Sequence, residues 1–249
     1  MKKIISFLVA VLMLSVICIS AFAAEYPKAP SADEKWWEWF YSLTPEQQAC
    51  INFRPSTNAK TADNSIPRET EIHQGDESSL SPFASLLPTG GGEPVYNYEY
   101  WENHKNYANC YIYAMDVITT TIGGANPGHY GGGEITSDTL SKPNIASLIY
   151  TAIQNDGPYL GNGRSIRTST KNEQPKSNEY KIAIAIAPGV DYHFYVQNSD
   201  GYWSHKPGIT SCTRYDASNS LISDPGAANR NYPYANYSKF CGYYIITRN

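Results

Sequence analysis

One cysteine and two histidines have the residue types and chain order that nucleophilic chemistry requires. In the stretch ANCYIYAMDVITT, Asn109 can cap a helix and Cys110 stands at the first turn of that helix. A helix N-terminus favours a thiolate because its unpaired N–H groups and its dipole attract negative charge. His193 and His205 follow in the segments DYHFYVQ and YWSHK. Together these groups could attack a carbonyl carbon, with the thiolate as nucleophile and an imidazole as base.

The elements that must position these groups are a helix and a sheet. Apolar side chains recur with helical spacing from Cys110 to Thr121, and Gly123 and Gly124 end this predicted helix. The segment 143–157, PNIASLIYTAIQNDG, predicts a second amphipathic helix that stops at its final glycine. The predicted strands follow, and they are YKIAIAIA (180–187), DYHFYVQ (191–197), YWSHK (202–206) and FCGYYIIT (240–247). Helices followed by an antiparallel sheet predict an α+β domain.

The turn between the two histidine strands decides whether the imidazoles can meet. If Ser199-Asp200-Gly201 forms a three-residue loop, Tyr195 faces His205 and His193 lies diagonally beside it. A two-residue turn would place the imidazoles on opposite faces. Asp followed by Gly suits a type I turn closed by a bulge, so we predict the longer loop.

The chain divides into four parts. Residues 1–23 have two lysines, an apolar run and a small-x-small cleavage site, so they predict a signal peptide and a secreted protein, extracellular or cell-wall associated. Residues 24–53 predict a short helical segment rich in tryptophan, whose default role is to complete the core. Residues 54–94 predict a linker, and residues 95–249 the compact domain. After the signal peptide, no run is long enough for a membrane span.

Composition excludes several classes of partner. The chain has 23 acidic and 19 basic residues, which argues against nucleic acid as the main partner. No CxxC or HxxxH pair supports a metal site, and no sequence feature implies a cofactor.

The cysteines allow a disulfide. An exported protein permits a bond between Cys212 and Cys241, and we expect this pair; the alternative is two buried thiols. Cys50 would then remain unpaired. A bond between Cys50 and Cys110 would exclude a nucleophilic role for Cys110.

A helix-opening cysteine, a strand histidine and a polar residue on the next strand together resemble the papain-like cysteine peptidases of the NlpC-like cell-wall type. The resemblance rests on order and spacing over residues 105–206, since NCYIYA and YHFYV differ from the usual motifs of that group. It implies an α+β papain-like domain in which the cysteine helix packs on the antiparallel sheet. It also implies Cys110 as nucleophile, His193 as base and His205 as the residue that orients the base.

The remaining roles are left open by the sequence. The oxyanion would be held by the Cys110 backbone N–H together with Tyr107 or Asn109. Three residues could replace His205 as the orienting group, and they are Asn198, Asp191 and Gln197.

The resemblance implies a secreted bacterial cysteine peptidase or amidase, with a peptide or peptidoglycan stem peptide as its substrate. Two alternatives remain. One is a non-catalytic secreted protein that binds cell-wall or other glycans through its many tyrosines, and the other is a secreted toxin or effector with the same Cys-His chemistry. A lone cysteine on an apolar helix face is also a common core residue. Cell-wall sedimentation unaffected by Cys110→Ala would favour the binding protein.

Overall fold

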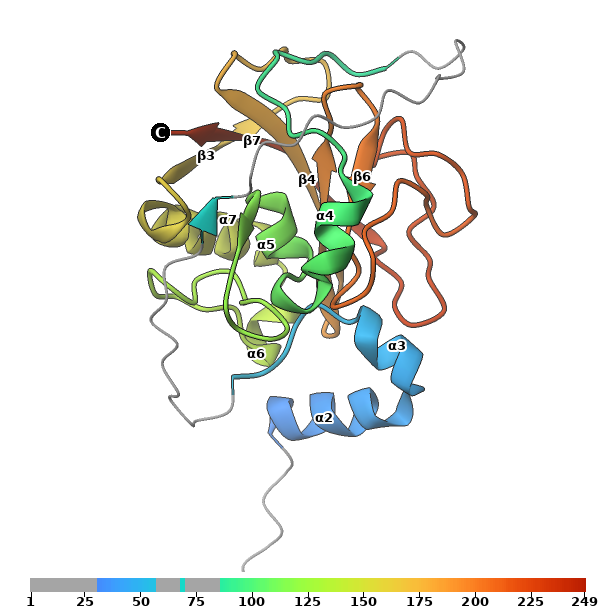
Figure 1. The fold of residues 1–249 in the computed structure, drawn as a ribbon. Helices are drawn as coiled ribbons and strands as arrows, with labels where there is room; N and C mark the ends of the chain where they lie inside the picture. Colours follow the sequence, from blue (N-terminus) through green and yellow to red (C-terminus); the bar gives the residue numbers. More distant parts are fainter. Residues whose placement is uncertain (1–30, 57–67, 70–85) are drawn as a thin grey trace, which may run out of the picture. The chain divides into compact units, whose positions relative to one another are not determined.

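The structure, a computed structural model, describes residues 31–56, 68–69 and 86–249. The predicted signal peptide, residues 1–23, lies outside the described residues, as does most of the predicted linker (Figure 1). Among the described helices, none is long and apolar enough to cross a membrane.

The chain has an α+β fold built on a five-stranded antiparallel sheet in the order β3-β7-β4-β5-β6. The strands of this sheet are β3 (Arg164–Ser169), β4 (Glu179–Ala187), β5 (Asp191–Gln197), β6 (Trp203–His205) and β7 (Lys239–Arg248). A small second sheet pairs β1 (Arg68–Glu69) with β2 (Val117–Ile118). The helices are α2 (Ala32–Ser42), α3 (Pro45–Cys50), α4 (Tyr98–Asn103), α5 (Cys110–Ala114), α6 (Ser137–Leu140) and α7 (Ile145–Asp156), with 3-10 turns η1 (Lys105–Tyr107) and η2 (Gly157–Tyr159).

The order of strands follows from their residues. The run EYKIAIAIA of β4 is buried along its whole length, so this strand occupies the centre of the sheet, as its apolar pattern predicts. The loop between β5 and β6 is the longer one, since Tyr195 pairs with His205 and Gly201 has a φ of +84°. This register is the one predicted from the Asp-Gly turn.

The cysteine helix is much shorter than its apolar pattern predicts. It ends at Ala114, and Asp116 has a positive φ of 53° before the chain enters β2. The following residues, VITTTI, are β-branched, and such residues lose side-chain freedom in a helix. The prediction of a helix to Thr121 is therefore wrong. The second predicted helix is confirmed as α7.

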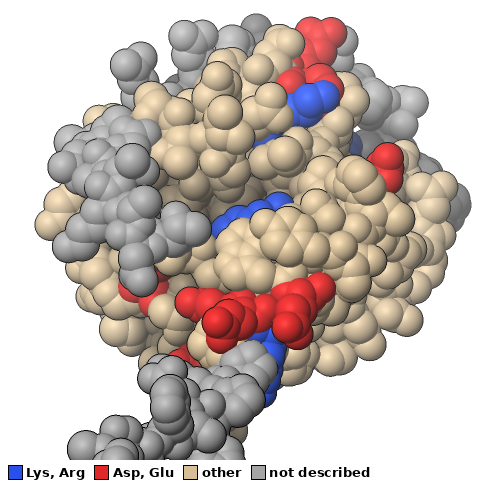
Figure 2. Space-filling view, turned by 90° about the horizontal axis from the view of Figure 1, so that it is seen from below, with Lys and Arg blue, Asp and Glu red and all other residues tan. Residues whose placement is uncertain are grey.

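The tryptophan-rich segment completes the core of the compact unit formed by residues 32–249. Trp36 and Phe40 of α2 are buried, and the Trp36 indole N–H donates to the Val190 carbonyl at 2.7 Å. The polar side of α2 and α3 carries exposed carboxylates. Figure 2, seen from below, shows acidic side chains gathered on this face.

Candidate functional site

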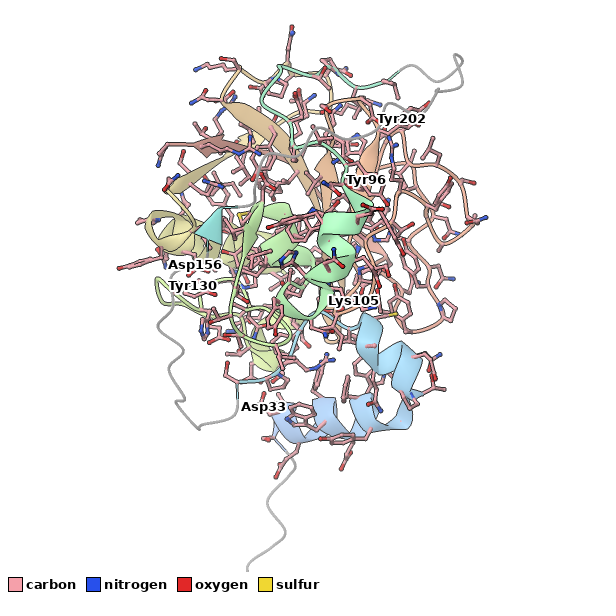
Figure 3. All side chains as sticks on the ribbon, viewed as in Figure 1. Asp33, Tyr96, Lys105, Tyr130, Asp156 and Tyr202 are labelled. Carbon is pink, nitrogen blue, oxygen red and sulfur yellow. The ribbon has the colours of Figure 1, made fainter. Side chains whose placement is uncertain are left out.

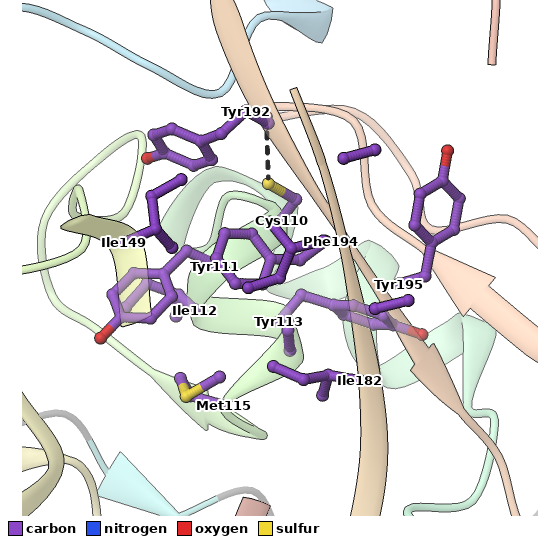
Figure 4. Close-up of a cluster of buried hydrophobic side chains, with 14 of the residues drawn as sticks. Cys110, Tyr111, Ile112, Tyr113, Met115, Ile149, Ile182, Tyr192, Phe194 and Tyr195 are labelled. Carbon is purple, nitrogen blue, oxygen red and sulfur yellow. Dashed lines mark hydrogen bonds between the residues drawn. The ribbon is translucent and has the colours of Figure 1, made fainter. Parts of the chain in front are cut away.

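Cys110 lies at the start of α5, where the sequence predicts it. Asn109 caps the helix, since its side-chain oxygen accepts from the Ile112 N–H at 3.1 Å. The thiol is fully buried and donates to the Tyr192 carbonyl at 3.7 Å, the dashed line in Figure 4. Burial, reinforced by the charge of Asp191, raises the pKa of Cys110 well above its ordinary value. A five-residue helix contributes little dipole to oppose that effect, so Cys110 is held as a neutral thiol.

On β5 the side chains of Phe194 and His193 point to opposite faces of the sheet, and the body of α5 packs on the face of Phe194. Side chains of a strand alternate between the two faces of its sheet. Phe194 contacts Tyr111 of α5, with ring centroids 5.5 Å apart, whereas His193 contacts Tyr195 and His205 on the opposite face. In Figure 4, Phe194 and Tyr195 lie on opposite sides of the strand. Among the described residues, no hydrogen bond joins the Cys110 sulfur to His193.

The two histidines form a hydrogen-bonded pair, with 2.7 Å between His193 Nε2 and His205 Nδ1. His205 Nε2 lies 2.9 Å from the Tyr215 carbonyl oxygen, which can only accept, so this nitrogen carries the proton. His205 Nδ1 is then an acceptor, and His193 Nε2–H donates to it. Both rings are therefore neutral in this arrangement.

Asn52 contacts the other end of this pair, a role that no motif in the sequence indicates. Its side-chain oxygen accepts from the N–H groups of Cys110 at 3.1 Å and Gly208 at 2.9 Å, which orients its amide. The Asn52 amide nitrogen donates to His193 Nδ1 at 3.1 Å. The same nitrogen also lies 3.1 Å from Asp191 Oδ2 and from the Tyr192 carbonyl oxygen, and all three acceptors face it. The imidazole lone pair that a base would use thus faces an N–H donor rather than the Cys110 thiol.

The same asparagine contacts a buried carboxylate. Asp191 Oδ2 accepts from the Asn52 backbone and side chain at 3.0 and 3.1 Å and from the Tyr237 hydroxyl at 2.7 Å. Asp191 Oδ1 accepts from the N–H groups of Phe53 and Tyr192. Burial raises the pKa of Asp191, and these donors oppose the shift. The carboxylate therefore holds residues 52–53 against β5 rather than orienting an imidazole.

The electrostatics of both imidazoles oppose a basic role. Burial and the neighbouring His205 lower the pKa of His193 well below its ordinary value. Burial lowers the pKa of His205 to about 4. Neither ring is placed to accept a proton near neutral pH.

A buried lysine supports the backbone that precedes Cys110. The Lys206 ammonium donates to three carbonyls, those of Lys105 at 2.7 Å, Ala108 at 2.5 Å and Gly208 at 2.7 Å. Burial lowers the pKa of Lys206 to about 7. The sequence showed only WSHKPG here, and a lysine in a turn gives no signal of burial.

The structure places the other predicted site residues in structural positions. The Asn109 amide nitrogen is committed to the Ala125 carbonyl at 2.9 Å, and the Tyr107 side chain is 39% exposed. Gln197 and Asn198 donate to the carbonyls of Leu87 and Pro94, toward the far end of β5 from His193. No group of His, Cys, Asp or Glu among the described residues could hold a metal ion.

The expected disulfide is absent. Cys212 and Cys241 are both free, as are Cys50 and Cys110. Cys212 is buried on the segment beside β6, whereas Cys241 lies on β7, and the sheet order puts β4 and β5 between β7 and β6. The bond would require the last strand to lie beside the segment after WSHKPG, and the strand order places β7 elsewhere.

Comparison with known proteins identifies a relative of different character. Insoluble matrix shell protein 1 from Ruditapes philippinarum is 35% identical over 134 residues, which cover 54% of this chain and 78% of the relative. No protein-family model matches the chain, and no solved structure matches it significantly.

This relationship corrects the functional prediction. The relative is a shell matrix protein of a mollusc, so the expectation of a secreted bacterial cysteine peptidase or other hydrolase is wrong. The toxin alternative used the same Cys-His chemistry and falls with it. The match is 35% identical and covers 78% of that relative, so the chain belongs to the family of insoluble matrix shell protein 1.

Proposed function

We propose that this protein is a non-catalytic component of an extracellular matrix. The observation that carries the proposal is the family relationship, because the relative is named for an insoluble shell matrix. Secretion agrees with the signal-like residues 1–23. This proposal corresponds to the alternative of a non-catalytic secreted binding protein, which the sequence left open.

The buried network supports a structural role for the residues that resemble a catalytic set. A cysteine nucleophile needs a thiolate within reach of a base. Here the Cys110 thiol is sealed and neutral, and the lone pair of His193 Nδ1 faces the N–H donor of Asn52. The same polar atoms that would perform catalysis instead tie residues 52–53, α5 and β5 together.

The fold is proposed to be a papain-like scaffold used without catalysis. Support comes from the helix that begins with Cys110 and packs on β5, and from the strand order that brings His193 beside His205. In this chain the His193 imidazole points to the face of the sheet opposite to the one on which Phe194 contacts α5.

The surface offers aromatic rings for contact with matrix polymers. Five tyrosine side chains are between 39% and 69% exposed, and they are Tyr41, Tyr98, Tyr107, Tyr159 and Tyr215. A tyrosine presents a large apolar face and a polar hydroxyl at low entropic cost, which suits adhesion to polysaccharide.

Sedimentation with insoluble polysaccharide tests the proposal. Purified protein is incubated with chitin particles and with cellulose particles, and the retained fraction is measured for wild type and Cys110→Ala. We expect retention on at least one polymer, unchanged by the substitution. A variant with Tyr41, Tyr98 and Tyr215 replaced by serine should lose most of it.

Two results would contradict parts of this proposal. Cleavage of a peptide substrate that disappears in Cys110→Ala would contradict the non-catalytic assignment. Absence of retention on both polymers would remove the glycan-binding part of the proposal.

A further inference from the structure

The hydrogen bonds through the two histidines form a chain with fixed ends. One end is the Asn52 amide nitrogen, which can only donate, and the other is the Tyr215 carbonyl, which can only accept. Between them lie three links, namely Asn52 to His193, His193 to His205, and His205 to Tyr215. We call this chain the histidine relay.

The relay holds one hydrogen per link and has no room for another. Asn52 supplies the hydrogen of the first link, and two neutral imidazoles supply one each to the other two. An extra proton on either ring must put two hydrogens into one link, whichever tautomers are chosen. With 3.1 Å and 2.7 Å between the nitrogens of the first two links, such a pair of donors cannot remain hydrogen-bonded.

The first link is the one that can open, because Asn52 belongs to a separate segment of chain. Residues 32–54, which we call the strap, comprise α2, α3 and the residues that follow them. The strap is attached to β5 through Asn52 and through the Phe53 N–H, which donates to Asp191 at 2.7 Å. Outside β5 it is bonded through Trp36 to Val190, Ala49 to Ile209, Arg54 to Asn126 and Asp33 to Ser137. The other two links join β5, β6 and the Tyr215 segment, which are paired through backbone hydrogen bonds.

We propose that the histidine relay is a pH-operated clasp, in which protonation of His193 breaks its bond to Asn52 and weakens the attachment of the strap to β5. This regulation goes beyond the matrix role and does not depend on it. Released from the amide, His193 Nδ1 can carry the added proton into water. The clasp is closed at neutral pH and opens on acidification.

Several ionisable groups face the pair. From β5 these are Asp191, whose oxygens are filled by donors, and Tyr195. From the segment between β6 and β7 they are Tyr232, Tyr237 and the more distant carboxylate of Asp216. Lys206, the next residue after His205, is committed to three carbonyls. Among the described contacts, none of these groups forms an ion pair with either imidazole. The charge of Asp216 raises the pKa of His205, but burial outweighs it.

The direction of the pH effect follows from burial. The pKa of His193 is lowered from 6.5 while the clasp is closed, and it returns toward 6.5 when the ring meets water. The open state therefore binds more protons than the closed state below about pH 6.5, and acid favours opening. For a ring that titrates only when released, the open fraction grows up to about 30-fold at pH 5.

Hydrogen–deuterium exchange tests the clasp on the full chain. Exchange is measured at about pH 7 and about pH 5, corrected for intrinsic rates, and the strap is compared with α7 in the same sample. We expect protection of the strap to fall by up to about 30-fold, with α7 unchanged. The double variant His193→Gln/His205→Gln should keep the strap protected at both pH values, because glutamine can accept and donate in the relay without titrating.

The control is a second pair of histidines. His104→Gln/His129→Gln, at partly exposed sites, should respond to acid like wild type. Titration of Asp191 is common to all variants and cancels in the comparison. Equal protection of the wild-type strap at both pH values would overturn the proposal, whether or not the double variant folds. An acid response that persists in a folded double variant would also overturn it.

Discussion

At the scale of single residues, Asn52 determines the protonation states at the centre of the molecule. Its oxygen accepts from two backbone N–H groups, so its nitrogen faces His193 Nδ1 together with Asp191 Oδ2 and the Tyr192 carbonyl oxygen. Cys110 and the two histidines could be found from the sequence, because residue type, order and turn chemistry are local signals. Asn52 could not, since its partners lie 58 to 156 positions away in the chain.

The relay predicts the tautomers of both imidazoles. We expect His193 and His205 to be neutral and protonated on Nε2 at neutral pH, because the chain of donors runs from Asn52 to the Tyr215 carbonyl. Long-range proton–nitrogen NMR spectra of the imidazoles distinguish the two tautomers and the charged form. An imidazolium pattern for His193 at neutral pH would be incompatible with the relay.

Removal of Asn52 should be costly. Asn52→Ala leaves the N–H groups of Cys110 and Gly208 without a partner, and each buried orphan costs about 1–3 kcal/mol. We expect a loss of about 3 kcal/mol or more in the free energy of unfolding, measured by urea titration. Asn103→Ala, at an exposed position on α4, serves as the control and should change stability by less than about 0.5 kcal/mol. A similar small effect for Asn52→Ala would show that the network is not needed for stability.

At the scale of elements, the strands were predictable and the cysteine helix was not. Alternating and continuous apolar runs fix β4, β5 and β7 locally, and the Asp-Gly loop fixes the register between Tyr195 and His205. The length of α5 depended on a competition between an apolar pattern of helical spacing and a run of β-branched residues. The edge strand β3, RSIRTS, lacks a strong pattern and was missed.

The glycine-rich loop before α6 is another element whose character depends on a distant residue. The glycine content of GGANPGHYGGGE is typical of a mobile loop, but Asp156 at the end of α7 accepts from the N–H groups of Gly128, Tyr130 and Gly131 at 2.6 to 2.8 Å. Figure 3 labels Asp156 and Tyr130 side by side. The carboxylate also accepts from the Tyr111 hydroxyl, so it links the loop to α5.

Replacing this carboxylate should loosen the loop. Asp156→Asn turns one acceptor oxygen into a donor that faces backbone N–H groups, and we expect a loss of about 2–3 kcal/mol, or about 5–10 °C in Tm. Differential scanning calorimetry measures the change. Asp138→Asn, exposed on α6, is the matched control and should shift Tm by no more than a degree or two. Equal Tm values for the two variants would argue against the anchoring role.

At the scale of the whole molecule, buried neutral histidines make stability depend on pH. The pKa of His205 is lowered to about 4 in the folded chain, against 6.5 in the unfolded chain. Between these values the unfolded chain binds more protons, so the free energy of unfolding is full above about pH 6.5 and declines as pH falls toward 4. Acidification should therefore lower the free energy of unfolding of this protein.

Urea unfolding at neutral pH and at about pH 5 measures this dependence. Each buried ring can contribute a loss of up to about 2 kcal/mol at pH 5. We expect His205→Gln to be less sensitive to acid than wild type, whatever its stability at neutral pH. An equal pH dependence in the two proteins would mean that His205 titrates alike in the folded and unfolded chains.

The reactivity of the Cys110 thiol tests most directly whether this protein lacks a Cys-His nucleophile. Reduced, folded protein is treated with iodoacetamide at neutral pH, and modification of each cysteine is followed by mass spectrometry. We predict that the half-buried Cys50 and Cys241 react first, and that the buried Cys110 and Cys212 react only after unfolding in urea. Preferential modification of Cys110 in the folded chain, lost in His193→Gln, would contradict this prediction. It would show that Cys110 is a nucleophile with His193 as its base.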